Sequence, residues 1–82
     1  LAGVYQIAVG VELTVVAKGR HLHWRLNRPE DEGDAREGEF APRTQLRFFV
    51  PEYDIEASFV RDEHRKVDHI LDSRGILMKK IG

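Results

Sequence analysis

Alternation of apolar and polar residues in short segments separated by turn formers is the feature that most limits how this chain can fold. Residues 21–27 show it most clearly, because Leu22, Trp24 and Leu26 fall on one face of an extended strand and His21, His23 and Arg25 fall on the other. Similar segments recur at about the eight- to twelve-residue spacing that is typical of all-β folds. The segments that we expect to form strands are 3–8, 12–18, 21–27, 39–44, 46–50, 55–61, 67–72 and 76–81.

None of these segments shows a helical stripe, so the pattern predicts an all-β antiparallel meander of about seven to eight short strands. A meander protects its edges best by closing into a small up-and-down barrel, with a sandwich as the alternative. Val67 and Ile70 are three residues apart, so a β-bulge is needed to place both on one face. The shared period of two predicts a core of Leu13, Val15, Leu22, Trp24, Leu26, Leu46, Phe48, Ile55, Ala57, Phe59 and Val67.

An acidic stretch at residues 28–39 interrupts the alternation. It contains Pro29, Gly33, Gly38 and six acidic residues, and it has no large apolar side chain. We therefore expect a long solvated loop. Its carboxylates do not follow the order of ligands of an EF-hand, so this interpretation is preferred to a calcium site.

Composition limits the classes of function. The chain has 82 residues, enough for one domain (1–82), and it begins at Leu1 rather than at methionine, so we expect a piece of a larger protein. Charged residues make up 33% of the chain but leave a net charge of −1, which argues against a nucleic-acid partner. No apolar run approaches the roughly 20 residues of a membrane span. The absence of cysteine excludes disulfides and thiolate metal sites but leaves the compartment open.

Residues able to support chemistry are few. His21 and His23 share one strand face and are weak candidates for metal ligands, with His69 as a conceivable third, although alternation predicts two solvent-facing side chains. Ser58 and Ser73 lie in neither a Ser-x-x-Lys nor a Gly-x-Ser-x-Gly motif. We therefore predict no catalytic residues and no cofactor. Three aromatic residues could either line a ligand cavity or fill the core, namely Trp24, Phe48 and Phe59.

The order of the apolar residues and turns also carries a family resemblance. Its features are Gly3 and Tyr5 in the first strand, Leu22, Trp24 and Leu26 in the third, the pair Phe48-Phe49, the turn at residues 59–62, and Lys66-Val67 leading to Gly75. In this order the chain resembles the C-terminal β-domain of serine hydrolases of the β-lactamase and penicillin-binding-protein class, a domain of unknown function. The resemblance covers nearly the whole chain and departs from the family pattern at residues 28–39, which are longer and more acidic.

The resemblance implies a lipocalin-like barrel of about eight strands that is not itself catalytic. It also implies a parent enzyme whose nucleophile and base lie upstream of Leu1. The leading hypothesis is therefore an accessory domain that packs on the catalytic domain of its parent and shapes substrate access or assembly. The alternative is a small lipocalin-like module that binds an apolar ligand, and a weaker third hypothesis is an enzyme that uses His21 and His23. The first predicts an apolar patch outside the barrel, the second an open apolar interior, and the third two convergent histidines with a further ligand.

Overall fold

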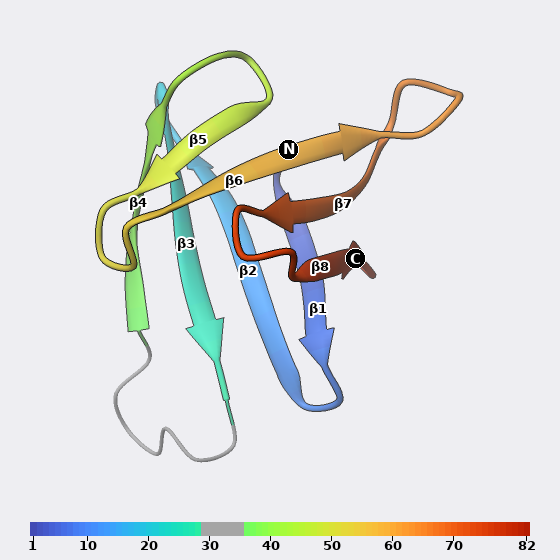
Figure 1. The fold of residues 1–82 in the computed structure, drawn as a ribbon, viewed down its shortest axis with the longest axis horizontal. Helices are drawn as coiled ribbons and strands as arrows, with labels where there is room; N and C mark the ends of the chain where they lie inside the picture. Colours follow the sequence, from blue (N-terminus) through green and yellow to red (C-terminus); the bar gives the residue numbers. More distant parts are fainter. Residues whose placement is uncertain (29–35) are drawn as a thin grey trace.

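Eight strands follow one another around a closed antiparallel barrel in the computed structural model, which describes residues 1–28 and 36–82 (Figure 1). Each strand pairs with its neighbours in sequence, and β8 pairs with β1. The prediction of a small all-β up-and-down barrel is confirmed. The strands are β1 (Gly3–Ala8), β2 (Val11–Lys18), β3 (His21–Asn27), β4 (Arg36–Pro42), β5 (Arg47–Val50), β6 (Ile55–Arg61), β7 (Val67–Asp72) and β8 (Leu77–Lys80).

The predicted bulge lies in β7. The pairing of β6 with β7 passes from Val60 opposite His69 to Arg61 opposite Val67, so Asp68 is the extra residue. This shift allows both Val67 and Ile70 to pack against the core. In the part of the chain that the structure describes, no helix is long and apolar enough to cross a membrane.

β4 begins earlier than the sequence indicated. The strand was expected to start at residue 39, but residues 36–38 also pair with β3, with Glu37 opposite Arg25 and Gly38 opposite Trp24. The opposite charges of Glu37 and Arg25 favour this pairing. Gly38, which reads as a loop residue, lies opposite Trp24 inside the barrel. The rest of the acidic stretch, residues 29–35, lies outside the described residues.

The turns that follow β6 and β7 have the same construction. In each turn an aspartate at the first position uses its Oδ1 atom to accept backbone N–H bonds from the second and fourth residues after it, at 2.8–3.0 Å. The third residue after the aspartate has a positive φ, 62° at Arg65 and 88° at Gly75. We call these segments the Asp62 turn (residues 62–66) and the Asp72 turn (residues 72–76). A turn that ends in this left-handed conformation suits an antiparallel hairpin.

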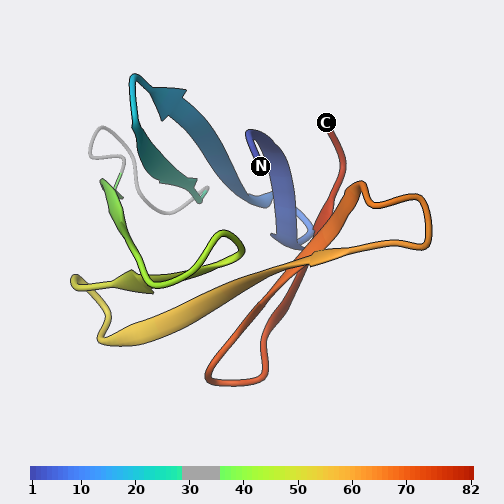
Figure 2. The same cartoon turned by 90° about the horizontal axis from the view of Figure 1, so that it is seen from above.

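Pairing is uneven around the barrel. β2 and β3 share seven residue pairs, whereas β4 meets β5 in two and β1 meets β8 in two. We call these two short contacts the seams. They separate β1–β4 from β5–β8, which Figure 2 shows along opposite sides of the barrel.

Four aromatic residues fill one end of the barrel and form what we call the aromatic plug: Tyr5, Phe40, Phe48 and Phe59. Their ring centroids lie 5.5–5.8 Å apart, mostly edge to face. The Tyr5 hydroxyl donates a hydrogen bond to the Leu1 carbonyl oxygen at 2.6 Å. Burial raises the pKa of Tyr5 to about 12. This end of the interior is therefore solid.

The predicted core is largely correct. Leu13, Val15, Trp24, Phe48, Ala57 and Phe59 are buried as expected. The five remaining members are half-buried against that core, namely Leu22, Leu26, Leu46, Ile55 and Val67. The buried set also includes residues that the sequence prediction omitted, namely Tyr5, Phe40, Val50, Ile70 and Met78.

Candidate ligand-binding cup

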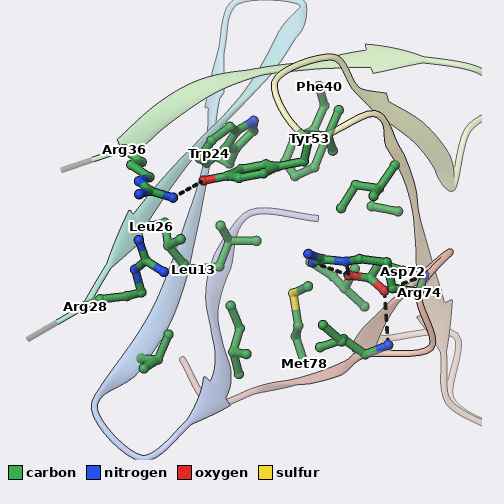
Figure 3. A pocket seen from close by; sticks show the side chains of 17 residues that line it. Leu13, Trp24, Leu26, Arg28, Arg36, Phe40, Tyr53, Asp72, Arg74 and Met78 are labelled. Atoms are coloured by element: carbon green, nitrogen blue, oxygen red, sulfur yellow. Dashed lines mark hydrogen bonds and ion pairs between the residues drawn. The ribbon is translucent and has the colours of Figure 1, made fainter. Parts of the chain in front are cut away.

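The end of the barrel opposite the aromatic plug holds a cavity of about 230 Å³. The connections β1–β2, β3–β4, β5–β6 and β7–β8 all lie at this end, because successive strands run in opposite directions. Apolar side chains make most of the wall, among them Ile7, Leu13, Leu26, Val50 and Met78 (Figure 3). We call this cavity the cup.

One side of the cup is built around Trp24. The centroids of its indole and of the Tyr53 ring lie 5.7 Å apart, and Tyr53 belongs to the β5–β6 turn. Gly38 makes this packing possible, because a Cβ atom there would lie 2.9 Å from Cζ2 of Trp24 and would collide with the carboxylate of Glu52. The missing side chain lets the β5–β6 turn fold against β3 and β4.

The opposite wall contains Asp72, the one buried charged residue among the described residues. Its Oδ2 atom accepts hydrogen bonds from Nε of Arg74 at 3.0 Å and from Nη2 at 2.6 Å. Its Oδ1 atom accepts the backbone N–H groups of Arg74 and Ile76. Burial would raise the pKa of Asp72, but the hydrogen bonds and the charge of Arg74 outweigh it and lower that pKa. Asp72 is therefore an ionised, fully paired structural group.

Cationic side chains stand around the cup. Among the described residues, the lining of the cup includes three arginines, Arg28, Arg36 and Arg74, and one acidic residue, Asp72. Arg36 donates from Nη1 to the Tyr53 hydroxyl at 3.4 Å, and Arg28 is engaged in an interaction of its own. Glu52, in the β5–β6 turn, is exposed, and its carboxylate lies against Gly38 beside Trp24. The cup therefore combines an apolar wall with arginine side chains.

The three predicted aromatic residues divide between cavity and core. Trp24 lines the cup and is buried, whereas Phe48 and Phe59 belong to the aromatic plug. The sequence left open whether the interior is open or filled. The structure places a filled end and an open end in the same barrel.

The structure does not bring the predicted metal ligands together with a third group. His21 and His23 lie on the outer face of β3, and Nδ1 of His21 is 4.0 Å from Glu39 Oε2. His69 lies on β7, separated from β3 by three strands, and contacts Asp68 at 3.0 Å. Within residues 1–28 and 36–82, no group of three or more histidine or acidic side chains is arranged to hold a metal ion.

The two serines occupy structural positions. Ser58 lies in β6 between Arg47 and Leu71 of the neighbouring strands. Ser73 follows β7, and its Oγ atom accepts a hydrogen bond from the backbone N–H of Glu56 at 3.0 Å. That bond ties the Asp72 turn to β6.

The outer surface carries one notable apolar pair. Leu71 of β7 and Leu77 of β8 pair directly, and their side chains are 41% and 52% exposed. The two side chains form a small exposed apolar patch. We call it the leucine pair.

Sequence reasoning missed the polar part of the cup, namely Arg36, Tyr53, Asp72 and Arg74. A signal for Asp72 was present, because it follows Ile70 by two residues and so points inward. The chain matches no protein-family model, no curated protein and no solved structure. The candidate site therefore depends on the geometry alone.

Proposed function

We propose that this domain is a non-catalytic binding module whose cup takes a small apolar ligand. One observation supports it above all others: the aromatic plug fills one end of the barrel while the other end holds an apolar cavity. Ligand sites are usually concave and mostly apolar with a few placed polar groups, and the cup has this character. The positions of Ser58 and Ser73 in the strand ladder and in a turn are in keeping with a role other than catalysis.

The size of the cup limits the ligand. A volume of 230 Å³ corresponds to roughly seven or eight groups the size of a water molecule, at about 30 Å³ each. A chain of six to eight carbon atoms fits that volume. Burial of about seven methylene groups contributes roughly 5–6 kcal/mol at about 0.8 kcal/mol each, against an association cost of about 4 kcal/mol or more. The difference is at most about 1–2 kcal/mol, so we expect weak binding.

Titration with octanol and with octanoate tests the proposal, followed by calorimetry and by the fluorescence of Trp24, the only tryptophan of the chain. Ala57 is buried and lines the cup, so Ala57→Leu should fill part of it and abolish binding of both probes. Ser58→Leu is the matched control, because it introduces the same side chain at the neighbouring residue, which does not line the cup. Circular dichroism establishes that both variants fold. If neither octanol nor octanoate binds to the wild-type domain, the proposal is refuted.

A second candidate function is the accessory role in a serine hydrolase of the β-lactamase class. The leucine pair favours it, because a contact surface outside the barrel is what docking on a catalytic domain requires. In this proposal the domain shapes substrate access or assembly, and the parent enzyme supplies the nucleophile and the base. The two functions are compatible, since the cup and the leucine pair lie on different faces of β7 and β8.

The accessory role is tested in the gene and in the parent protein. A reading frame that continues upstream of Leu1 through a Ser-x-x-Lys motif would support it, and a frame without one would remove it. In a parent enzyme of this kind, Leu71→Lys combined with Leu77→Lys should change KM or assembly and leave the chemical step unchanged. Lys79→Ala is the control, because Lys79 lies beside Leu77 across from His69 and outside the leucine pair.

A further inference from the structure

We infer that the β5–β6 turn, residues 51–54, is a lid on the cup, which opens when Tyr53 withdraws from Trp24 and Arg36 and so admits and releases the ligand. This inference rests on the proposed binding function and adds how the ligand reaches the site. Figure 3 shows the Tyr53 side chain extended across Trp24 with its hydroxyl at Arg36, so the turn reaches over one side of the cup.

The backbone of the lid is not bonded to the wall that it covers. Residues 36–40 of β4 pair with β3 but not with β5, because the two residue pairs between β4 and β5 lie beyond them. The backbone N–H groups of Tyr53 and Asp54 bond to carbonyl oxygens at the end of β5 and within the lid itself, at 3.2 and 3.3 Å. In the ranges that the structure describes, no backbone hydrogen bond joins the lid to β3 or β4. The lid can therefore leave this wall without breaking a strand ladder.

The described contacts between the lid and this wall are made by side chains. The ring centroids of Tyr53 and Trp24 lie 5.7 Å apart with their planes tilted by 43°, and the Tyr53 hydroxyl accepts a hydrogen bond from Arg36 at the long distance of 3.4 Å. Glu52 is exposed, and its carboxylate lies in the space left by Gly38. Tyr53 is itself 36% exposed, so it gives up only part of its burial when it withdraws. Opening therefore breaks few contacts.

A buried indole N–H group brings the free energies of the closed and open lid closer together. Trp24 is 3% exposed, and its Nε1 atom has no hydrogen-bond partner among the described residues. A buried donor without an acceptor raises the free energy of the closed form. Withdrawal of Tyr53 uncovers the indole to water, which can accept that hydrogen bond. The closed lid thus carries a cost that the open lid does not.

The hinge of the lid lies at the ends of β5 and β6. Val50 and Ile55 form the last residue pair of that ladder, so the lid is the segment between two paired residues. Asp54 precedes Ile55 and has a φ of 52°, in the left-handed region that costs free energy for a residue with a Cβ atom. Rotation at Asp54 relieves this cost as the lid opens. Hinges are usually a few residues at the ends of elements, and Asp54 is in such a place.

Hydrogen exchange of the Trp24 indole N–H in the free protein tests the opening, with the amides of the β2–β3 ladder as the reference. A lid that is open about a tenth of the time gives the indole a protection factor of about ten, far below that of those amides. Low urea concentrations should not change the indole rate, because a local opening exposes little surface. Gly38→Ala should raise that rate, since its Cβ atom would meet the Glu52 carboxylate and lie 2.9 Å from Cζ2 of Trp24. Tyr53→Phe is the matched control, because it keeps the ring and loses only the hydrogen bond from Arg36.

Stopped-flow measurement of octanol binding, followed by Trp24 fluorescence, tests whether the lid controls access. Tyr53→Ala removes the ring that covers Trp24, so octanol should associate about tenfold faster, the inverse of the open fraction. A lost contact alone would raise the dissociation rate and leave association unchanged. Circular dichroism establishes that the variants fold.

Two results would overturn the inference and leave the proposed function standing. One is an indole N–H as protected as the β2–β3 amides and with the same dependence on urea. The other is an octanol association rate that Tyr53→Ala leaves unchanged. If octanol does not bind to the wild-type chain at all, the proposed function fails, and the lid has no ligand to admit.

Discussion

Replacement of Asp72 by alanine gives the sharpest test of how this barrel is held together. The Asp72 side chain is fully buried and accepts four hydrogen bonds. Two come from the backbone N–H groups of Arg74 and Ile76, and two come from the guanidinium of Arg74. Removal leaves two turn N–H groups without acceptors, at about 1–3 kcal/mol for each group that water cannot reach. The half-exposed guanidinium of Arg74 can turn to solvent, so its loss adds little. We expect a total cost of about 2–4 kcal/mol, against a stability of about 4–12 kcal/mol for a chain of this length.

The Asp62 turn supplies the control. The Asp62 side chain makes the same two backbone contacts through Oδ1 but is exposed, and no arginine side chain of the described ranges donates to its carboxylate. Asp62→Ala should therefore cost about 0.5–1 kcal/mol, because water replaces the lost acceptor. Urea denaturation followed by Trp24 fluorescence and by circular dichroism measures both losses. Equal losses in the two variants would refute the reasoning that burial and the ion pair set the importance of Asp72.

The same residue predicts a dependence on pH. The pKa of Asp72 is lowered from its ordinary value of 3.8 in the folded protein. Its stabilising contribution is therefore complete above that value and is lost as pH falls through the folded pKa. The stability difference between the wild type and Asp72→Asn should narrow below pH 3.8 and should not change between pH 5 and pH 8.

Four further predictions follow from other parts of the molecule. Burial raises the pKa of Tyr5 from 10.0 to about 12. The contribution of Tyr5 to the free energy of unfolding should therefore be fully present below pH 10.0, and about 2–3 kcal/mol should be lost as the pH rises through about 12. Tyr5→Phe should abolish this alkaline loss, and Tyr53→Phe should retain it. Arg65→Gly should raise the free energy of unfolding by about 0.5–1 kcal/mol, since Arg65 has a positive φ where the Asp72 turn uses Gly75; an unchanged urea midpoint would contradict this. Trp24→Ala should cost about 3–5 kcal/mol and unfold most of the protein, which a circular dichroism melt would show. The isolated chain should hydrolyse no ester, amide or β-lactam substrate, and turnover that disappears in Ser58→Ala or Ser73→Ala would contradict its assignment as non-catalytic.

Alternation predicted the strands well where one face is apolar and the other polar. Residues 21–27, 55–61 and 67–72 have the predicted bounds for this reason. The start of β4 escaped prediction because its inward position is Gly38, which has no side chain to show the alternation. The space that Gly38 leaves is used by Trp24 and the β5–β6 turn, and that contact joins segments distant in sequence.

The cup itself could not be predicted from the pattern of residues. Periodicity shows which side chains point inward, but it does not show how far each lies along the barrel axis. Phe48 and Phe59 meet at one end because β5 and β6 are paired with Phe48 opposite Ala57, a register that the sequence does not reveal. Arg36 and Arg74 flank turns and read as ordinary surface charges, so their approach to one cavity depends on closure of the barrel.

The two seams are the places where the strand pairing of the barrel opens most easily. Each joins two four-stranded ribbons by two residue pairs, so one seam can part while every longer ladder stays intact. The seam between β1 and β8 is reinforced by backbone bonds from Val4 to Gly82 and from Ile81 to Val4. The seam between β4 and β5 includes Phe48 of the aromatic plug, so its opening would loosen the filled end of the barrel. We expect amide hydrogens there to exchange faster than those between β2 and β3. The filled end of the barrel would then loosen at a lower free energy than the long ladder between β2 and β3.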